Sequence, residues 1–454
     1  MFEELRRLLS RAIGEYADLR YEVKRETRIT FQSGDLTEVS SSTGDGYVLR
    51  LLKGGGFATV AFTRLTDAES AIRRAEENAE LQGRLARQPV RLARTDVVKD
   101  SWYPNLDLDP ATVPLDAKID VLQRYGAIPL RSDRICAVEL EYLEVARRKY
   151  FASSEGSEVC EDVTTNWIIG HVTARDGSRT QRVRVGINHS DGLRALLNRE
   201  ADFESAASLA SELVKAAPPE PGTYRVLIDP ELSGVFLHEA FGHTCEADSV
   251  EDMPSARERL GIGAPLGSEI LNVKDDPTLP GQLGFYHYDD EGVRARPVQL
   301  LRNGVLVGRL HSRRTAASFG EPLTGHCVAE DYRFAPIVRM GCIVLEPGRE
   351  SVPELLEKLG DGLYLVGQLG GETTQDEFNF GAQYGHVVKN GRKTQMVRDA
   401  GISGGLYATL RDVIAVGNDL QFTEFGTCGK AEQMNLRSAW GAPHVLIDRL
   451  LVSG

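Results

Sequence analysis

The stretch YRVLIDPELSGVFLHEAFGHTCEAD, residues 224–248, indicates how the second half of this chain folds. It begins with a short apolar strand that leads into Asp229 and Pro230, where Asp can cap a helix and Pro suits the first helical turn. Leu232 and Phe236 contribute to an apolar face on the predicted helix. We therefore expect a strand that turns directly into a buried helix.

Three ionisable side chains, His238, Glu239 and His243, lie within this otherwise apolar segment. Burying them without a partner is costly, and a metal ion is the compensation that we expect. Neutral imidazoles bind zinc, and a Glu beside the first His can polarise a zinc-bound water. The alternative is a pair of core histidines that hydrogen-bond to backbone groups.

The spacing of the two histidines differs from that in the His-Glu-x-x-His helix of zinc proteases. In that motif the histidines are four residues apart and about 40° apart around the helix axis. His238 and His243 are five residues apart, which opens the angle in a regular α-helix to about 140°. Both rings could then not reach one ion. We therefore predict either a π-bulge within 238–243 or a helix that loosens at Gly242.

The segment 218–222, Pro-Pro-Glu-Pro-Gly, cannot continue a helix, and we place a linker there. The sequence predicts an α+β protein with an N-terminal α/β domain at 1–217 and a β-rich domain at 223–454. Helices are expected at 2–13, near 115–125 and at 200–217. Another is expected to start at Thr66, which can form a capping box with Glu69. Strand patterns occur at 19–31, 46–52, 57–62, 135–146, 149–153 and 161–173, and Asn-Gly pairs at 303–304 and 390–391 predict hairpins.

Composition excludes several classes of protein. With 454 residues, 41% of them hydrophobic, the chain can form a real core and is not mainly disordered. Its 53 basic and 66 acidic residues give a net charge of −13, which argues against binding to nucleic acid. We expect neither a membrane span nor a secretory signal, because the apolar runs are short and the N-terminus is acidic. Six cysteines without a CxxC pair indicate a reducing compartment, the cytoplasm.

Blocks of sequence in the second half resemble the TldD/PmbA family, and in particular its metal-bearing TldD branch. The blocks occur in the family's order and, with the His-Glu motif, cover about 224–454, whereas the first half is similar more loosely. They are Asp289-Asp290-Glu291-Gly292, Asn303-Gly304, Thr324-Gly325, Pro336 to Met340, Gly370-Gly371-Glu372, Val416 to Leu420 and Gly426-Thr427-Cys428-Gly429-Lys430.

This resemblance implies a zinc metallopeptidase with one Zn²⁺ per chain. Carried onto this sequence, the ligands are His238, His243 and Cys428, and Glu239 is the general base. Three protein ligands leave a fourth position for water, as a catalytic zinc site requires. Cys245 and Glu246 are rival ligands because they lie within three residues of His243. Cys428 could also be a buried free thiol, or the nucleophile of a cysteine hydrolase.

The resemblance further implies a substrate and a partner. Family members cut unfolded or flexible peptides, and TldD proteins usually pair with a metal-free PmbA/TldE-like subunit, although a homodimer is possible. A regulatory or scaffold role without hydrolysis is a second hypothesis, in line with the family's association with DNA gyrase modulation. The chain departs from the family pattern at 326–331 and 341–342, both expected to face substrate, and we expect 289–291 to form a solvated acidic turn.

Overall fold

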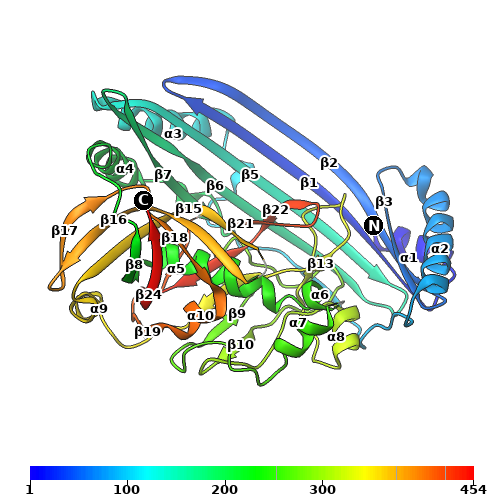
Figure 1. Ribbon diagram of the computed structural model, residues 1–454. Helices are drawn as coiled ribbons and strands as arrows, with labels where there is room; N and C mark the ends of the chain where they lie inside the picture. Colours follow the sequence, from blue (N-terminus) through cyan, green and yellow to red (C-terminus); the bar gives the residue numbers. More distant parts are fainter. Residues whose placement is uncertain (252, 375, 425) are drawn as a thin grey trace.

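The N-terminal half is built on one large curved sheet (Figure 1). The computed structural model describes residues 1–251, 253–374, 376–424 and 426–454. The strands of this sheet are β1 Tyr16–Gln32, β2 Asp35–Lys53, β3 Gly56–Phe62, β4 Lys99–Trp102, β5 Ile135–Ser153, β6 Glu158–Asp176 and β7 Arg179–His189. Their order is β3-β2-β1-β5-β6, with both β4 and β7 paired to β6. Only β4 runs parallel to its neighbour, so the predicted antiparallel sheet is confirmed.

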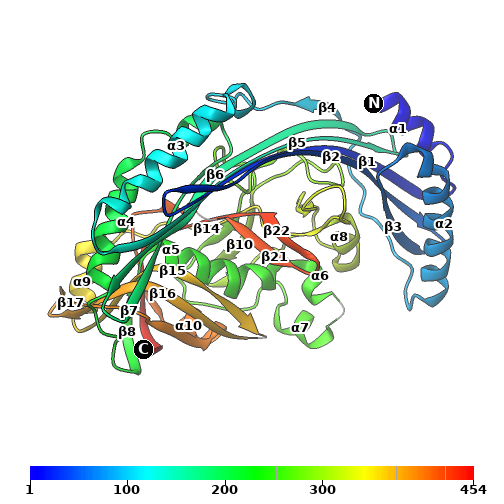
Figure 2. The same ribbon diagram turned by 90° about the horizontal axis from the view of Figure 1, so that it is seen from above.

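Helices pack near the two ends of this sheet, which arches over the C-terminal half (Figure 2). They are α1 Phe2–Leu9, α2 Ala68–Leu85, α3 Leu115–Ala127 and α4 Glu200–Leu213. One apolar core joins α1 and α2 to β1, β2 and β3, and a second joins α3 and α4 to β5, β6 and β7. The flanking helices predicted from sequence are therefore present.

Helix ends differ from the predicted ones by a few residues. The prediction of a capping box between Thr66 and Glu69 is wrong. Leu65–Asp67 forms a 3₁₀ turn, and Asp67 is the N-cap of α2 without a side-chain hydrogen bond. α1 ends at Leu9 and α4 at Leu213, several residues earlier than the apolar pattern extends. Apolar periodicity marks the face of a helix but not its last turn, which depends on capping and tertiary contacts. The division of the chain at 218–222 stays a prediction.

The C-terminal half is rich in short strands and carries six α-helices in the described residues. The strands are β8 Gly222–Ile228, β9 Val273–Asp275, β10 Val298–Arg302, β11 Val305–Leu306, β12 Cys327–Val328, β13 Ile337–Val338, β14 Cys342–Leu345, β15 Gly362–Thr374, β16 Glu377–Lys389, β17 Arg392–Val397, β18 Gly401–Gly405, β19 Val413–Val416, β20 Gln421–Phe422, β21 Thr427–Lys430, β22 Gln433–Arg437, β23 Ala439–Ala442 and β24 Val445–Ser453. The helices are α5 Pro230–Phe236, α6 Ala247–Val250, α7 Pro254–Arg259, α8 Arg313–Phe319, α9 Val352–Leu359 and α10 Leu406–Arg411.

Two larger sheets enclose the main apolar core of this half. One has the order β15-β8-β24-β18-β16-β17, and an extra pairing of β15 with β16 closes it on itself. The other has the order β11-β10-β9-β14-β23-β20. Both predicted Asn-Gly hairpins are present, joining β10 to β11 and β16 to β17, and all four turn residues have positive φ. The hairpin β21–β22 forms a small sheet of its own.

The acidic turn at 289–291 is buried, so the prediction that it is solvated is wrong. Asp290 lies 3.0 Å from Arg20 and 3.1 Å from Lys149, both on strands of the N-terminal sheet. Glu291 pairs with Arg50 at 2.8 Å. The cationic partners of this turn lie on strands more than 130 residues earlier in the chain, so they cannot be predicted from the local sequence. These buried ion pairs join the two halves of the chain.

No helix in the described ranges is long and apolar enough to cross a membrane.

The two regions where the sequence departs from the family pattern have different surroundings. Gly341 and Cys342 are buried at the start of β14, which contradicts the expectation that they face a substrate. His326 is also buried and lies 3.0 Å from Asp275. Asp331, by contrast, lines a cavity.

Candidate metal centre

Strand β8 delivers the chain directly into a buried helix, as the sequence predicts. Asp229 caps α5: its Oδ1 accepts a hydrogen bond from the backbone N–H of Leu232 at 2.9 Å and from that of Gly367 at 3.0 Å. Pro230 occupies the first helical turn. Since α5 is buried on nearly every side, the segment that follows it is held firmly within the core.

The segment that carries the two histidines is not a regular α-helix. A π-helical turn spans Leu237–Phe241 and is followed by a 3₁₀ turn at Gly242–Cys245. The π-helical alternative predicted from the five-residue spacing is therefore confirmed. The wider turn accommodates one extra residue and brings the rings of His238 and His243 to a centroid separation of 5.2 Å.

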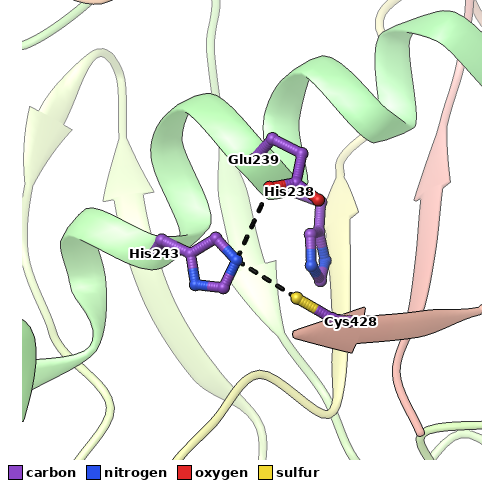
Figure 3. A group of neighbouring side chains, drawn as sticks. All are labelled: His238, Glu239, His243 and Cys428. Carbon is purple, nitrogen blue, oxygen red and sulfur yellow. Dashed lines mark hydrogen bonds and ion pairs between the residues drawn. The ribbon is translucent and has the colours of Figure 1, made fainter. Parts of the chain in front are cut away.

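Four possible ligand side chains converge at this turn (Figure 3). His243 Nε2 lies 3.2 Å from Cys428 Sγ and 3.7 Å from Glu239 Oε2. One donor atom from each of His238, Glu239, His243 and Cys428 lies within 4.8 Å of the others. Cys428 lies on β21 and follows His243 by 185 residues in the chain. Figure 3 shows its sulfur pointing from the strand toward the two imidazoles.

His238 gives the clearest indication that the cluster holds a ligand. Its side chain is fully buried against Trp440, and neither ring nitrogen has a hydrogen-bond partner in the part of the chain that the structure describes. Burial, with smaller contributions from His243 and Arg339, lowers the pKa of His238 well below its usual range, so the ring is neutral. Since an unpaired buried polar group is costly, a neutral imidazole here fits a metal ligand.

Glu246 orients the second histidine. It is fully buried, and its Oε2 lies 2.9 Å from His243 Nδ1. With Nδ1–H donating to this carboxylate, His243 presents Nε2 to Cys428. Burial alone would raise the pKa of Glu246, but His243 and Lys430 lower it well below its usual range, so it remains a carboxylate.

Glu246 is therefore a positioning residue in this geometry rather than one of the converging donors. The sequence indicates Glu246 only as a rival ligand, although its three-residue spacing from His243 is a signal for a side-chain contact. Its other oxygen accepts from the backbone N–H of Met340 at 3.2 Å. Cys245, the other rival, lies in the hydrophobic core and outside the cluster, and burial raises the pKa of its thiol.

Replacing Glu246 with Gln is expected to weaken metal binding by roughly 10–100-fold, because the charge that orients and polarises His243 is lost. A metal titration against a competing chelator measures the change. Asp248→Asn is the matched control: Asp248 and Glu246 both contact Lys430, at 2.5 and 3.0 Å, but only Glu246 bonds to His243. Equal affinities for the native protein and Glu246→Gln would contradict the positioning role.

Two family models match the chain. The PmbA/TldA metallopeptidase C-terminal domain matches residues 221–454, and the PmbA/TldA metallopeptidase domain 1 matches residues 17–79. The first match contains all four side chains of the cluster.

Three curated relatives are similar to this chain over nearly their whole length. A metalloprotease of Methanocaldococcus jannaschii is 32% identical over 440 residues, covering 95% of each chain. A metalloprotease of Archaeoglobus fulgidus is 34% identical over 414 residues, covering 90% of this chain and 92% of its own. A protein named zinc metalloprotease TldD homolog, from Saccharolobus solfataricus, is 28% identical and covers 97% and 96%.

Solved structures share the fold at lower identity. A protein described as a putative modulator of a DNA gyrase from Thermotoga maritima has a TM-score of 0.81 and 22% identity, covering 100% of both chains. TldE from Thermococcus kodakarensis has a TM-score of 0.79 and 17% identity, again over 100% of both chains. The family models and the curated relatives together establish that this chain belongs to the TldD/PmbA family of metallopeptidases.

Proposed function

We propose that this protein is a zinc-dependent peptidase that hydrolyses unfolded or flexible peptides. The observation that carries the proposal is the convergence of His243 and Cys428 on the buried imidazole of His238. Neither nitrogen of that imidazole has a hydrogen-bond partner in the described residues. Two nitrogens and a thiolate are a donor set that suits Zn²⁺. The relatives named metalloproteases support the class of reaction.

In this proposal Glu239 is the general base. Zinc, when bound, supplies a Lewis acid that makes water a nucleophile at neutral pH. Glu239 takes the proton from the attacking water and later passes it to the leaving amine. Burial raises the pKa of Glu239, which suits a carboxylate that holds a proton between these two steps. Glu246 keeps His243 in the orientation that the site requires.

A second candidate is a hydrolase with Cys428 as its nucleophile. The separation of 3.2 Å between Cys428 Sγ and His243 Nε2 favours it, because a neighbouring His activates a catalytic thiol. A thiol nucleophile requires neither a metal nor Glu239. A regulatory role without hydrolysis is the third possibility, since solved structures of this fold are described as gyrase modulators.

Metal removal tests the proposal directly. The native protein is expected to contain about one zinc per chain and to cleave an unstructured peptide. Treatment with a chelator is expected to abolish cleavage, and added Zn²⁺ to restore it, because the metal makes the nucleophile. Elemental analysis and a fluorogenic peptide assay provide the two readouts. Cleavage that survives complete zinc removal would favour the cysteine hydrolase, and no cleavage in any state would favour the regulatory role.

We also propose that the chain works in the cytoplasm, paired with a metal-free TldE-like subunit. The likeness to the TldE fold supports such a pair, and a homodimer is the alternative. Sedimentation of the purified chain, alone and with a TldE-type protein from the same source, distinguishes the two.

A further inference from the structure

A cavity of about 650 Å³ separates the inner face of the N-terminal sheet from the β21–β22 hairpin. Its apolar floor comes from two neighbouring strands, with Leu143 and Val145 on β5 and Trp167 and Ile169 on β6. Leu143 pairs directly with Trp167 across the strands, so these side chains form one continuous patch. Apolar surface of this kind favours a ligand with apolar side chains.

This cavity and the metal cluster lie on opposite faces of the β21–β22 hairpin. Thr427 pairs with Arg437, and both line the cavity. The adjacent pair is Cys428 and Leu436, and the Cys428 sulfur points to His243. Because successive side chains in a strand point to opposite faces, a ligand in the cavity lies behind the hairpin that carries Cys428. The cavity is therefore a site separate from the proposed reaction centre.

Several charged side chains that line the cavity already neutralise one another. Glu141 is paired with Arg28, and Asp331 with Arg333 at 2.6 Å. Paired charges of this kind have little attraction left for a ligand.

Arg437 differs from these side chains. Its Nη1 donates a hydrogen bond to the carbonyl oxygen of Leu283 at 3.4 Å, and no carboxylate in the described ranges forms an ion pair with it. Burial, together with neighbouring Arg147, lowers the pKa of Arg437 to about 10, so it is cationic at neutral pH. Glu161, Asp290 and Glu22 act on Arg437 from a distance, but each is already paired with another cation. The half-buried guanidinium therefore keeps donors for the carboxylate of a ligand.

Two further polar groups lie beside the same cavity. Thr165 and Trp167 line it, and neither Thr165 Oγ1 nor Trp167 Nε1 has a hydrogen-bond partner among the described residues. Both groups can donate a hydrogen bond. Both donor atoms are covered by their neighbours, so the surface that the cavity offers to a ligand consists of the apolar patch and Arg437.

We propose that this cavity binds a carboxylate-bearing, apolar segment of the peptide substrate, with the carboxylate on Arg437 and the apolar side chains on the β5–β6 floor. The identification of the ligand as a peptide rests on the proposed function, whereas the preference for a carboxylate rests on the cavity alone. A chain terminus and an Asp or Glu side chain present the same pair of oxygens. The site anchors substrate behind the hairpin and takes no part in cleavage.

Calorimetry on the metal-free full-length protein tests the proposal without hydrolysis. The probes are one N-acetylated peptide of Gly, Ser and Leu in three forms: a free C-terminal carboxylate, a C-terminal amide, and an amide with one internal Glu. At least one acidic form is expected to bind about tenfold tighter than the plain amide. Preference for the first form identifies a chain terminus, and preference for the third identifies an acidic side chain. Equal affinities, or no binding of any form, would overturn the proposal.

Substitution tests the assignment to Arg437. Arg437→Gln is expected to remove the preference for the acidic form, and Arg437→Lys to retain part of it. Arg333→Gln is the matched control, because that cation lines the same cavity but is already paired with Asp331. Equal losses in the Arg437 and Arg333 variants would refute the assignment, and thermal unfolding checks that both are folded. Peptide binding without hydrolysis in the zinc-loaded native protein would contradict the proposed function but not this site.

Discussion

Glu239→Gln is expected to lower kcat for peptide hydrolysis by about 10³-fold while zinc content stays near that of the native protein. Gln cannot accept the proton of the attacking water, and general acid–base catalysis contributes about 10²–10⁴-fold. The proposed ligands His238, His243 and Cys428 are unchanged in this variant. Steady-state kinetics and elemental analysis of the same preparation measure both quantities.

Glu231→Gln is the matched control for this variant. Glu231 is another half-buried Glu, near the start of α5, and desolvation raises its pKa to about 7, but it lies outside the cluster of converging donors. Its substitution is expected to leave kcat within a few-fold of the native value. Full activity in Glu239→Gln would rule out a base role for Glu239 and favour Cys428 as the nucleophile, whereas loss of zinc would make Glu239 a ligand.

Cys428→Ser is expected to weaken zinc binding by at least about 100-fold and to remove activity with it. A serine hydroxyl is not a zinc ligand of the kind that structural and catalytic sites use, and two imidazoles alone leave the site short of three protein ligands. Competition with a chromophoric chelator measures the affinity. Replacing zinc with cobalt gives an independent readout, because the thiolate-to-cobalt absorption band is expected to disappear in the variant.

Two other cysteines serve as controls for this experiment. Cys136 is exposed, and Cys136→Ser is expected to bind zinc as the native protein does. Cys245→Ser tests the rival ligand next to His243, and zinc affinity is expected to be unchanged in the folded fraction, since Cys245 lies in the apolar core. A loss of zinc in Cys245→Ser but not in Cys428→Ser would contradict the ligand set proposed above.

Much of the local structure could be predicted because it depends on neighbours in the sequence. Asp229 and Pro230 predict the start of α5, and the structure places that helix there. The five-residue spacing of His238 and His243 predicts a departure from the α-helix, which the π-helical turn confirms. Both kinds of signal are short-range, since capping and helix periodicity act within one or two turns.

Features that depend on distant partners could not be predicted from the residues alone. The turn at 289–291 looks like a solvated acidic loop, and only the folded protein places Arg20, Arg50 and Lys149 against it. Glu246 looks like a rival ligand until the fold brings it between His243 and Lys430. The sequence around an acidic residue does not indicate whether water solvates its carboxylate or a distant guanidinium pairs with it.

The residues alone suffice to predict the strand-to-helix entry, the distorted turn with its two histidines and, through resemblance to a family, that Cys428 joins them. Three features emerge only in the folded protein: the sulfur lies 3.2 Å from His243, the ring of His238 has no hydrogen-bond partner in the described residues, and Arg437 faces a cavity on the opposite side of the same hairpin. The physical reason is range: backbone preferences are set by adjacent residues, whereas a site shared by segments 185 residues apart exists only once long-range packing has brought them together.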